Sequence, residues 1–207
     1  MESDHRKQLL AGVLRTMQGV VDGMGPDDLG RVTPCAEYDV RRLVEHIVGW
    51  QQVFAASAAG LEPPLADGSP TYVASEDVSV DQRAASLALL ESLESAGPTL
   101  TMPYRGETPT SVLVDELIAE SVIHTWDLAT SLGLEIAFEH EAVAVAHVGL
   151  TALLGESFAA EGFAQQSGPA SGGDLVALLR RSGRSPVGES WHDHAGDEQI
   201  GRGSAPA

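Results

Sequence analysis

The amino-acid sequence predicts an all-α protein, built as an antiparallel bundle of helices with long crossover connections. Several segments repeat apolar residues at the period of an amphipathic helix. Glycine, proline and small polar residues separate these segments, and no segment shows the strict alternation of a half-buried strand. With 207 residues and no internal repeat, we expect a single domain over residues 1–190 and a flexible tail over 191–207.

The first three helices are bounded by capping or turn-forming residues. A helix over residues 6–24 ends at the Gly-Pro pair that follows it. Asp39 is placed to cap the N-terminus of a second helix, which runs to about residue 59 and ends before glycine and proline residues. After a long, weakly patterned stretch, we expect a third helix near 80–96. The segment 97–111 is rich in turn formers, and we expect it to be extended in part.

The second half of the chain predicts two longer helices and a short one. The fourth helix covers about 110–132 and ends at Gly133, because glycine favours the left-handed conformation found just after helix C-termini. A fifth helix, over 139–160, is rich in alanine and valine. A loop and a short extra C-terminal helix, "LVALLRRSG" at 175–183, follow it.

Charge and composition exclude several classes of partner. The chain has 12 basic and 30 acidic residues, so nucleic acid and anionic membrane surfaces would repel its net charge of −18. No apolar run is long enough to span a bilayer and no signal peptide is evident, which predicts a cytoplasmic protein. Cys35 is the only cysteine and is expected to be structural, so a single chain can form neither a disulfide nor a cysteine metal cluster.

Polar residues interrupt the apolar face of the fourth helix. On a helical projection, five residues fall within about 80° of one another. These residues are Leu113, Leu117, Glu120, His124 and Leu128. A carboxylate on such a face costs free energy unless it is paired or bound to a cation, and Glu120 and His124 are spaced to hold one metal ion. The alternative is an ordinary surface pair worth a few tenths of a kcal/mol.

His46 supplies a third candidate ligand, from the second helix. It flanks the buried stripe of that helix, so a bundle in which the two helices face each other can bring His46, Glu120 and His124 together. Two imidazoles and one carboxylate form a normal ligand set for a catalytic divalent metal, with the fourth position open to water or substrate. The alternative for His46 is a hydrogen-bonded core histidine.

Three acidic residues near these candidates have less specific patterns. Asp127 follows His124 by one helical turn and can orient the imidazole by accepting a hydrogen bond, although a solvated acid fits the sequence equally well. Glu45 and Glu116 are expected to be solvated. Asp127 is therefore the only candidate for a supporting catalytic role.

Two segments resemble a known family. Residues 33–60, "TPCAEYDVRRLVEHIVGWQQVFAASAAG", are similar to the N-terminal signature of the mycothiol-dependent maleylpyruvate isomerase metal-binding domain, within the DinB/YfiT-like superfamily. Residues 116–133, "ELIAESVIHTWDLATSLG", resemble its second signature, Glu-x-x-x-His-x-Trp-Asp. The segment "GPASGGDLVALLRRSGRSP" resembles the end of the same pattern, so the likeness covers most of residues 5–186.

The resemblance implies a DinB-like four-helix bundle that holds a divalent metal, typically zinc, through His46, Glu120 and His124. It also implies a low-molecular-weight thiol such as mycothiol as a cofactor, activated at the metal. Three aromatic residues are candidates for the pocket wall, with packing as their alternative role: Tyr38, Trp50 and Trp126. The family's isomerase has a further C-terminal domain, which we do not expect after the short last segment of this chain, and we therefore expect no maleylpyruvate isomerase activity.

The leading functional hypothesis is a divalent-metal-dependent thiol S-transferase or isomerase that acts on a small electrophilic molecule. One alternative is a non-catalytic protein that binds a small ligand through its metal. A second alternative is a hydrolase in which the metal activates water. We expect neither nucleic acid nor a membrane as a partner, and a homodimer is left open.

Overall fold

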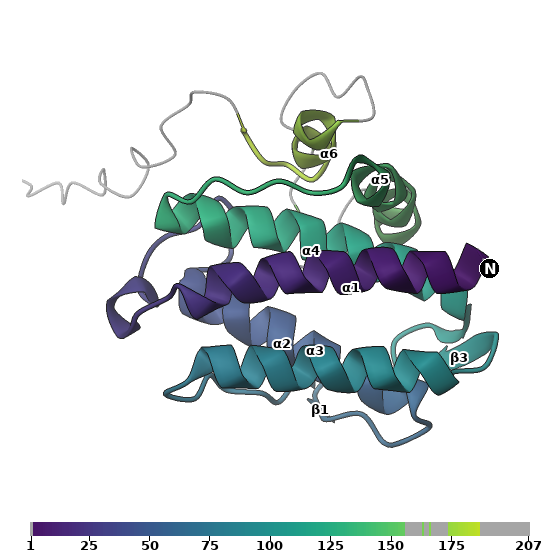
Figure 1. Cartoon of the computed structure of the whole chain (residues 1–207). Helices are drawn as coiled ribbons and strands as arrows, with labels where there is room; N and C mark the ends of the chain where they lie inside the picture. Colours follow the sequence, from purple (N-terminus) through teal and green to yellow (C-terminus); the bar gives the residue numbers. More distant parts are fainter. Residues whose placement is uncertain (1, 156–162, 164–165, 167–173, 187–207) are drawn as a thin grey trace, which may run out of the picture.

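The computed structural model describes residues 2–155, 163, 166 and 174–186, and most of them are helical (Figure 1). The predicted all-α class is therefore confirmed. The helices are α1 (Glu2–Asp22), α2 (Val40–Ala58), α3 (Val78–Ser95), α4 (Thr110–Leu132), α5 (His140–Leu154) and α6 (Leu175–Arg181), with a short 3-10 helix, η1 (Pro26–Asp28), after α1. No helix in the described part of the chain is both long and apolar enough to cross a membrane.

Two predicted helix boundaries are confirmed by their capping geometry. The side chain of Asp39 accepts a hydrogen bond from the backbone N–H of Arg42 at 2.8 Å, which satisfies one of the free donors at the start of α2. Gly133 follows α4 with a φ of 70°, and its N–H donates to the carbonyl of Thr130. A residue with a Cβ would be strained in this left-handed conformation, so glycine ends the helix there.

Two short antiparallel hairpins lie in the long connections. The pair β1 (Leu65–Ala66) and β2 (Ser69–Pro70) lies between α2 and α3, and the pair β3 (Thr99–Met102) and β4 (Gly106–Pro109) lies between α3 and α4. The second hairpin confirms the extended conformation expected within residues 97–111. The first was not expected, because strands of two residues are too short to show an alternating pattern.

Two predictions fall wholly or partly outside the described residues. The expected fifth helix reaches Leu154 in the structure, and residues 156–160 of its expected span are not described. The expected tail, 191–207, also lies outside the described residues. The predicted domain limits therefore stay predictions.

Helices α1 to α4 pack against one another. Helix α1 packs against α3 and α4, and α2 packs against the same two helices, so each of the four contacts two of the others. Figure 1 shows α1 and α4 side by side, with α3 on one side of this pair and α5 and α6 on the other. Because α5 covers the side of α4 that faces away from α2, α4 is enclosed by neighbours and 17 of its 23 residues are buried.

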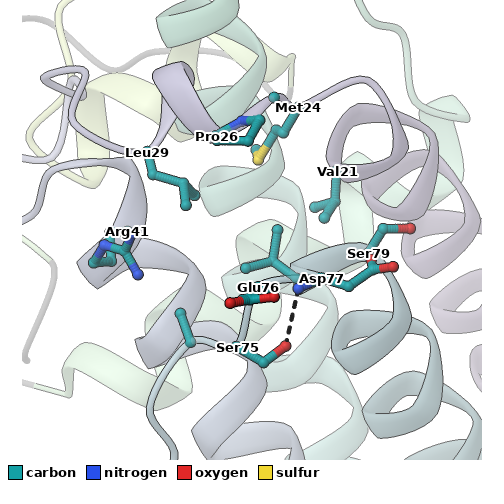
Figure 2. A pocket seen from close by; sticks show the side chains of 12 residues that line it. Val21, Met24, Pro26, Leu29, Arg41, Ser75, Glu76, Asp77 and Ser79 are labelled. Carbon is teal, nitrogen blue, oxygen red and sulfur yellow. Dashed lines mark hydrogen bonds between the residues drawn. The ribbon is translucent and has the colours of Figure 1, made fainter.

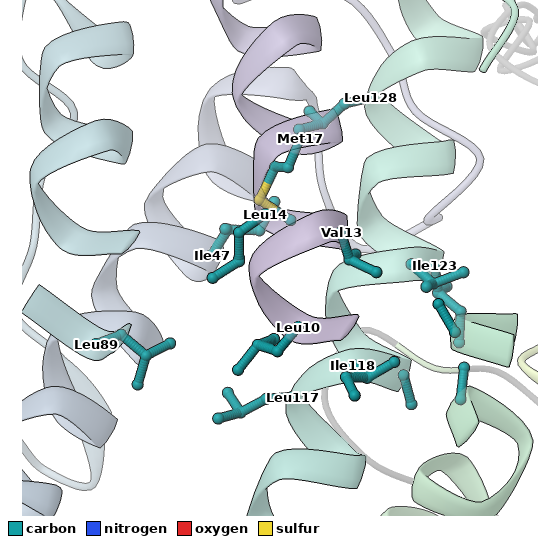
Figure 3. Packing of buried hydrophobic residues seen from close by; sticks show 14 of the residues in the cluster. Leu10, Val13, Leu14, Met17, Ile47, Leu89, Leu117, Ile118, Ile123 and Leu128 are labelled. Carbon is teal, nitrogen blue, oxygen red and sulfur yellow. The ribbon is translucent and has the colours of Figure 1, made fainter. Parts of the chain in front are cut away.

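The core is filled by apolar side chains from all four helices (Figure 3). Leu10 and Met17 project from one face of α1 at helical spacing and are fully buried. Ile47 comes from α2, Leu89 from α3 and Ile118 from α4. This apolar packing supplies the main driving force that holds α2 and α4 in a fixed relative position.

Helices α4 and α5 approach too closely for an ordinary side chain at Gly149. A Cβ atom built on Gly149 would lie 1.9 Å from the carbonyl oxygen of Asp115 on α4. No real Cβ atom tolerates this distance, so the glycine allows the backbones to touch. This close approach buries the side of α4 that faces away from α2.

Candidate metal centre

Helices α2 and α4 bring three candidate ligands together, as the sequence interpretation requires. His46 lies on α2, and Glu120 and His124 lie one turn apart on α4. One potential ligand atom from each residue lies within 4.8 Å of the other two. Oε2 of Glu120 is 3.2 Å from Nε2 of His124 and 3.7 Å from Nε2 of His46. Within the described part of the chain, no fourth His, Cys, Asp or Glu joins this group.

The polar atoms of this group fit a bound cation. Nε2 of His124 is buried and has no hydrogen-bond partner among the described residues. Leaving a buried polar atom unpaired is costly, and a metal ion is a partner that an imidazole lone pair can bind. The side chain of His124 is 2% exposed whereas that of Glu120 is 25% exposed, so the group is closed on the His124 side and open on the Glu120 side.

Asp127 is buried behind His124 and is not a solvated acid. Its Oδ2 lies 3.1 Å from Nδ1 of His124. An ionised carboxylate can only accept, so Nδ1 carries a hydrogen and Nε2 is the ring nitrogen that can bind a metal. The burial of Asp127 rules out the solvated acid, and its contact with Nδ1 is compatible with orienting the imidazole, which stays a prediction.

Arg184 also belongs to this group, and the sequence interpretation did not find it. Its Nη2 donates to Oδ2 of Asp127 at 2.6 Å and its Nε donates to Oδ1 at 3.1 Å. The side chain is 2% exposed, which is unusual for an arginine. The sequence feature that could have drawn attention to Arg184 is a basic residue in the C-terminal segment of a strongly acidic chain. Helical periodicity does not place its side chain, because Arg184 lies beyond the end of α6.

The charges of the group stabilise one another. Burial raises the pKa of Glu120, but the nearby imidazoles of His124 and His46 outweigh it and lower the pKa to about 2. Burial likewise raises the pKa of Asp127, and the charge of Arg184 together with the hydrogen bond from His124 brings it below its ordinary value. Both carboxylates are therefore ionised at neutral pH, which a cation site needs.

Tyr38 and Trp50 lie against His46, whereas Trp126 does not line the site. The hydroxyl of Tyr38 is 3.2 Å from Nδ1 of His46, so it can accept a hydrogen bond from that nitrogen when Nε2 binds a metal. Trp50 packs edge-on to His46, with ring centroids 6.5 Å apart. Trp126 packs against the hydrophobic core instead, which was the alternative role considered for it.

Two neighbouring cavities meet at His46 and Trp50. The inner one, about 30 Å³, is lined by all three candidate ligands and by apolar side chains from α1, α2 and α4. This volume can hold an ion or a water molecule but no organic cofactor. The outer one, about 250 Å³, is lined by Tyr38, Arg42, Glu45, His46, Trp50, Ser69, Pro70 and Tyr72. A small organic molecule in the outer recess would therefore lie beside His46.

The expectation that Glu116 and Glu45 are solvated was wrong for Glu116. Its carboxylate is buried and accepts a hydrogen bond from Nη1 of Arg105 at 2.7 Å. Arg105 lies in the β3–β4 hairpin, which covers this turn of α4, so tertiary contact overrides the helical pattern. Glu45 is half-buried, and its Oε1 accepts a hydrogen bond from the backbone N–H of Ala74 at 3.1 Å.

A larger cavity, about 690 Å³, lies away from the candidate ligands (Figure 2). It is bounded by the end of α1, by η1 and by the connection that leads into α3. Arg41 lies on one side of it and Glu76 and Asp77 on the other. None of its lining residues lines the inner or outer cavity at His46, so it is a separate feature of the surface.

A comparison with known protein families agrees with the resemblance that two segments of the sequence show. The family model for the mycothiol maleylpyruvate isomerase N-terminal domain matches residues 10–129. The chain belongs to this family. The match includes His46, Glu120, His124 and Asp127, whereas Arg184 lies beyond it.

Two similar proteins are found in Mycobacterium tuberculosis. The chain is 35% identical over 133 residues to the uncharacterized proteins MT0763 and Rv0738 from two strains of Mycobacterium tuberculosis. These matches cover 59% of this chain and 68% of each relative. No solved structure matches the chain.

Proposed function

We propose that this protein is a divalent-metal-dependent enzyme of the thiol S-transferase or isomerase type, with zinc as its metal. The observation that carries the proposal is the convergence of His46, Glu120 and His124 on one point, together with the unpaired Nε2 of His124. Two imidazoles and a carboxylate suit zinc and leave a coordination position for another ligand. Membership of the mycothiol-related family supports a low-molecular-weight thiol, such as mycothiol, as that ligand.

The residues of the site have distinct tasks in this proposal. His46, Glu120 and His124 hold the ion, which would lower the pKa of a thiol so that its thiolate forms near neutral pH. Asp127 keeps the His124 ring oriented. In the transfer, the thiol sulfur forms a bond to an electrophilic carbon, and the thiol proton leaves with the displaced group or is returned to the adduct. An isomerase would then release the same thiol.

The outer recess is the proposed binding place of the small electrophile. It lies beside His46 and has three aromatic rings, those of Tyr38, Trp50 and Tyr72, and the guanidinium of Arg42 in its wall. Aromatic walls with a few polar groups are typical of small-molecule sites. The inner cavity is too small for such a molecule, so the substrate would approach the ion from the recess.

We further propose that α1–α4 form the DinB-like four-helix bundle that the resemblance implies. The support is that each of these helices packs against two of the other three. Long connections that contain hairpins join α2 to α3 and α3 to α4. Such contacts and connections are those expected of a bundle with crossover connections.

Two alternative functions make different demands on the site. A non-catalytic metal protein needs no thiol and no reacting substrate, and the outer recess would then only bind a ligand. A hydrolase needs a general base near the attacking water. Asp127 is a poor base because its carboxylate already accepts hydrogen bonds from His124 and Arg184. Glu120 is a proposed ligand, so neither acid favours hydrolysis.

The test combines metal analysis with a thiol-transfer assay. We expect the purified protein to bind close to one zinc ion per chain and to couple mycothiol or cysteine to a chromogenic electrophile such as 1-chloro-2,4-dinitrobenzene. Chelation of the metal or His46→Ala should abolish the enzymatic rate, because the thiolate is no longer stabilised. The readout is the absorbance of the thioether product, corrected for the uncatalysed reaction.

Other outcomes would point to the alternatives. Full zinc occupancy without adduct formation across a panel of thiols and electrophiles would favour the non-catalytic binding protein. Metal-dependent consumption of an ester or amide without any thiol would favour the hydrolase. Full occupancy in His46→Ala would contradict the ligand assignment itself.

A further inference from the structure

Arg184 is a buried cation whose three guanidinium nitrogens are all engaged. Nη2 and Nε hold the two oxygens of Asp127, and Nη1 donates to the backbone carbonyl of Ser182 at 2.8 Å. The Asp127 side chain is fully buried, with an exposed fraction of 0%. A bidentate pair of hydrogen bonds of this kind fixes the plane of a carboxylate as well as its position.

The Asp127 carboxylate that Arg184 holds also contacts His124. Oδ2 of Asp127 accepts from Nη2 of Arg184 and also lies 3.1 Å from Nδ1 of His124. Because Nδ1 is held by Asp127, Nε2 is the ring nitrogen that can bind a metal, and it faces Oε2 of Glu120, 3.2 Å away. The orientation of the ring therefore depends on the orientation of the carboxylate, which Arg184 sets.

A second contact from the same part of the chain restrains the ring. The centroid of Phe163 is 5.5 Å from that of His124, and Cζ of Arg184 is 5.1 Å from the Phe163 ring. The segment that carries Arg184 is itself anchored, because Arg181 on α6 donates to Thr151 on α5 at 2.7 Å. Phe163 and Arg184 thus lie on the His124 side of the group.

Stability alone does not explain the pair of Arg184 and Asp127. Removing both charges from water costs free energy that their attraction only partly recovers, and apolar residues of the same volume often stabilise a core as well or better. If the pair serves to orient the imidazole of His124, both its burial and the two hydrogen bonds from Arg184 to Asp127 are explained.

We propose that Arg184 is a positioning residue of the metal centre, which holds Nε2 of His124 toward Glu120 through Asp127. This inference rests on the proposed metal centre and extends it to residues 174–186, which the family match does not include. The C-terminal segment thereby contributes to metal affinity without supplying a ligand.

The first test is the dissociation constant for Zn²⁺, measured by competition with a chromophoric chelator. Arg184→Met keeps an aliphatic side chain and removes both hydrogen bonds to Asp127. We expect it to weaken zinc binding by at least about tenfold, as the loss of a residue that supports a metal ligand does. Arg181→Met is the matched control, because it removes an arginine that anchors the same segment but does not contact Asp127. We expect the control to bind zinc as the wild type does.

The second test does not require metal. Nitrogen-15 NMR of the metal-free protein reports on the hydrogen bond that Nδ1 of His124 makes with Asp127. We expect this hydrogen-bonded Nδ1–H signal in the wild type and in Arg181→Met, and a weakened or lost hydrogen bond in Arg184→Met. If Arg184→Met does not fold, the double variant Arg184→Met with Asp127→Asn avoids an unpaired buried carboxylate, and we expect the same weakening of zinc binding from it.

The outcomes separate this inference from the proposed function. Wild-type zinc affinity and an unchanged His124 signal in Arg184→Met, or wild-type affinity in the double variant, would overturn the inference and leave the ligand set intact. Equal weakening in Arg181→Met would also overturn it, because docking of the segment would then be the cause. A wild type that binds no zinc would contradict the metal centre itself.

Discussion

At the scale of single residues, the candidate centre is defined by which polar atoms are paired and which are not. Nδ1 of His124 is bonded to Asp127, while Nε2 is buried without a partner among the described residues. The paired nitrogen fixes the ring and the unpaired one is available to a ligand. His46 has a similar arrangement, with Tyr38 at Nδ1 and Glu120 on the Nε2 side.

Cys35 gives a prediction at this scale. Its side chain is buried, and burial raises the pKa of the thiol to about 11. At pH 8, about one thiol in a thousand is then ionised in the folded protein, against about one in ten at the ordinary value of 9.0. We expect a thiol reagent such as 5,5′-dithiobis(2-nitrobenzoic acid) to label the native protein slowly and the unfolded protein quickly.

The control for this prediction is the same protein in guanidinium chloride, in which the single thiol should react completely. Rapid labelling of the folded chain at pH 8 would show that Cys35 is an accessible, reactive thiol. Its structural assignment from the sequence would then be wrong.

The ligand residues could be predicted from the sequence, whereas the residues that support them could not. Helical spacing places Glu120 and His124 on one face, and this needs only local geometry. The pairing of Asp127 with Arg184 joins residues that lie 57 positions apart, and helical spacing carries no information on such a contact. Glu116 was misjudged for the same reason, since its partner Arg105 lies in a hairpin that periodicity does not place.

At the scale of elements, the position of α4 between its neighbours decides how well the site is held. Its apolar surface extends beyond a single stripe because α1, α2, α5 and the β3–β4 hairpin all contact it. An enclosed helix of this kind has a weak amphipathic pattern. This explains why the bounds of α4 were predicted correctly from its ends while the surroundings of its acidic residues were not.

Gly149→Ala tests the close approach of α4 and α5. The added methyl would collide with the backbone of Asp115, so the helices must separate, and we expect a loss of roughly 3 kcal/mol or more in the free energy of unfolding. Gly19→Ala is the matched control, because nothing lies within 4 Å of its Cβ position in α1. Alanine is the better helix former there, so we expect a gain of about 0.5–1 kcal/mol.

Urea unfolding followed by circular dichroism measures both variants. A Gly149→Ala protein as stable as the wild type would mean that α4 and α5 are not in backbone contact. The burial of α4 on that side would then have to be reconsidered.

At the scale of the whole molecule, the all-α class and the order of the helices could be predicted because glycine, proline and capping residues separate them. The packing of α2 against α4 was a requirement of the metal hypothesis, and the structure contains it. The docking of α6 on α5 depends on contacts distant in sequence, so local patterns could not reveal it, and the strands of the β1–β2 hairpin are too short to show a pattern.

A metal held between α2 and α4 should also stabilise the whole fold, because a ligand that binds only the native state shifts the unfolding equilibrium. At a free zinc concentration a hundredfold above the dissociation constant, this stabilisation is about 2.7 kcal/mol. For a chain of this size, such a change raises the melting temperature by roughly 5–10 °C. Removal of the metal with a chelator should reverse the effect.

The most direct test of the metal centre is a thermal melt with chelator and with added zinc, for the wild type, Glu120→Gln and Glu45→Gln. Glu45 is the matched control, since it is a half-buried acid that lines the outer recess but is not a candidate ligand. We predict that zinc raises the melting temperature of the wild type and of Glu45→Gln equally and that of Glu120→Gln much less. An equal rise in all three proteins, or none in the wild type, would contradict a metal site built on Glu120.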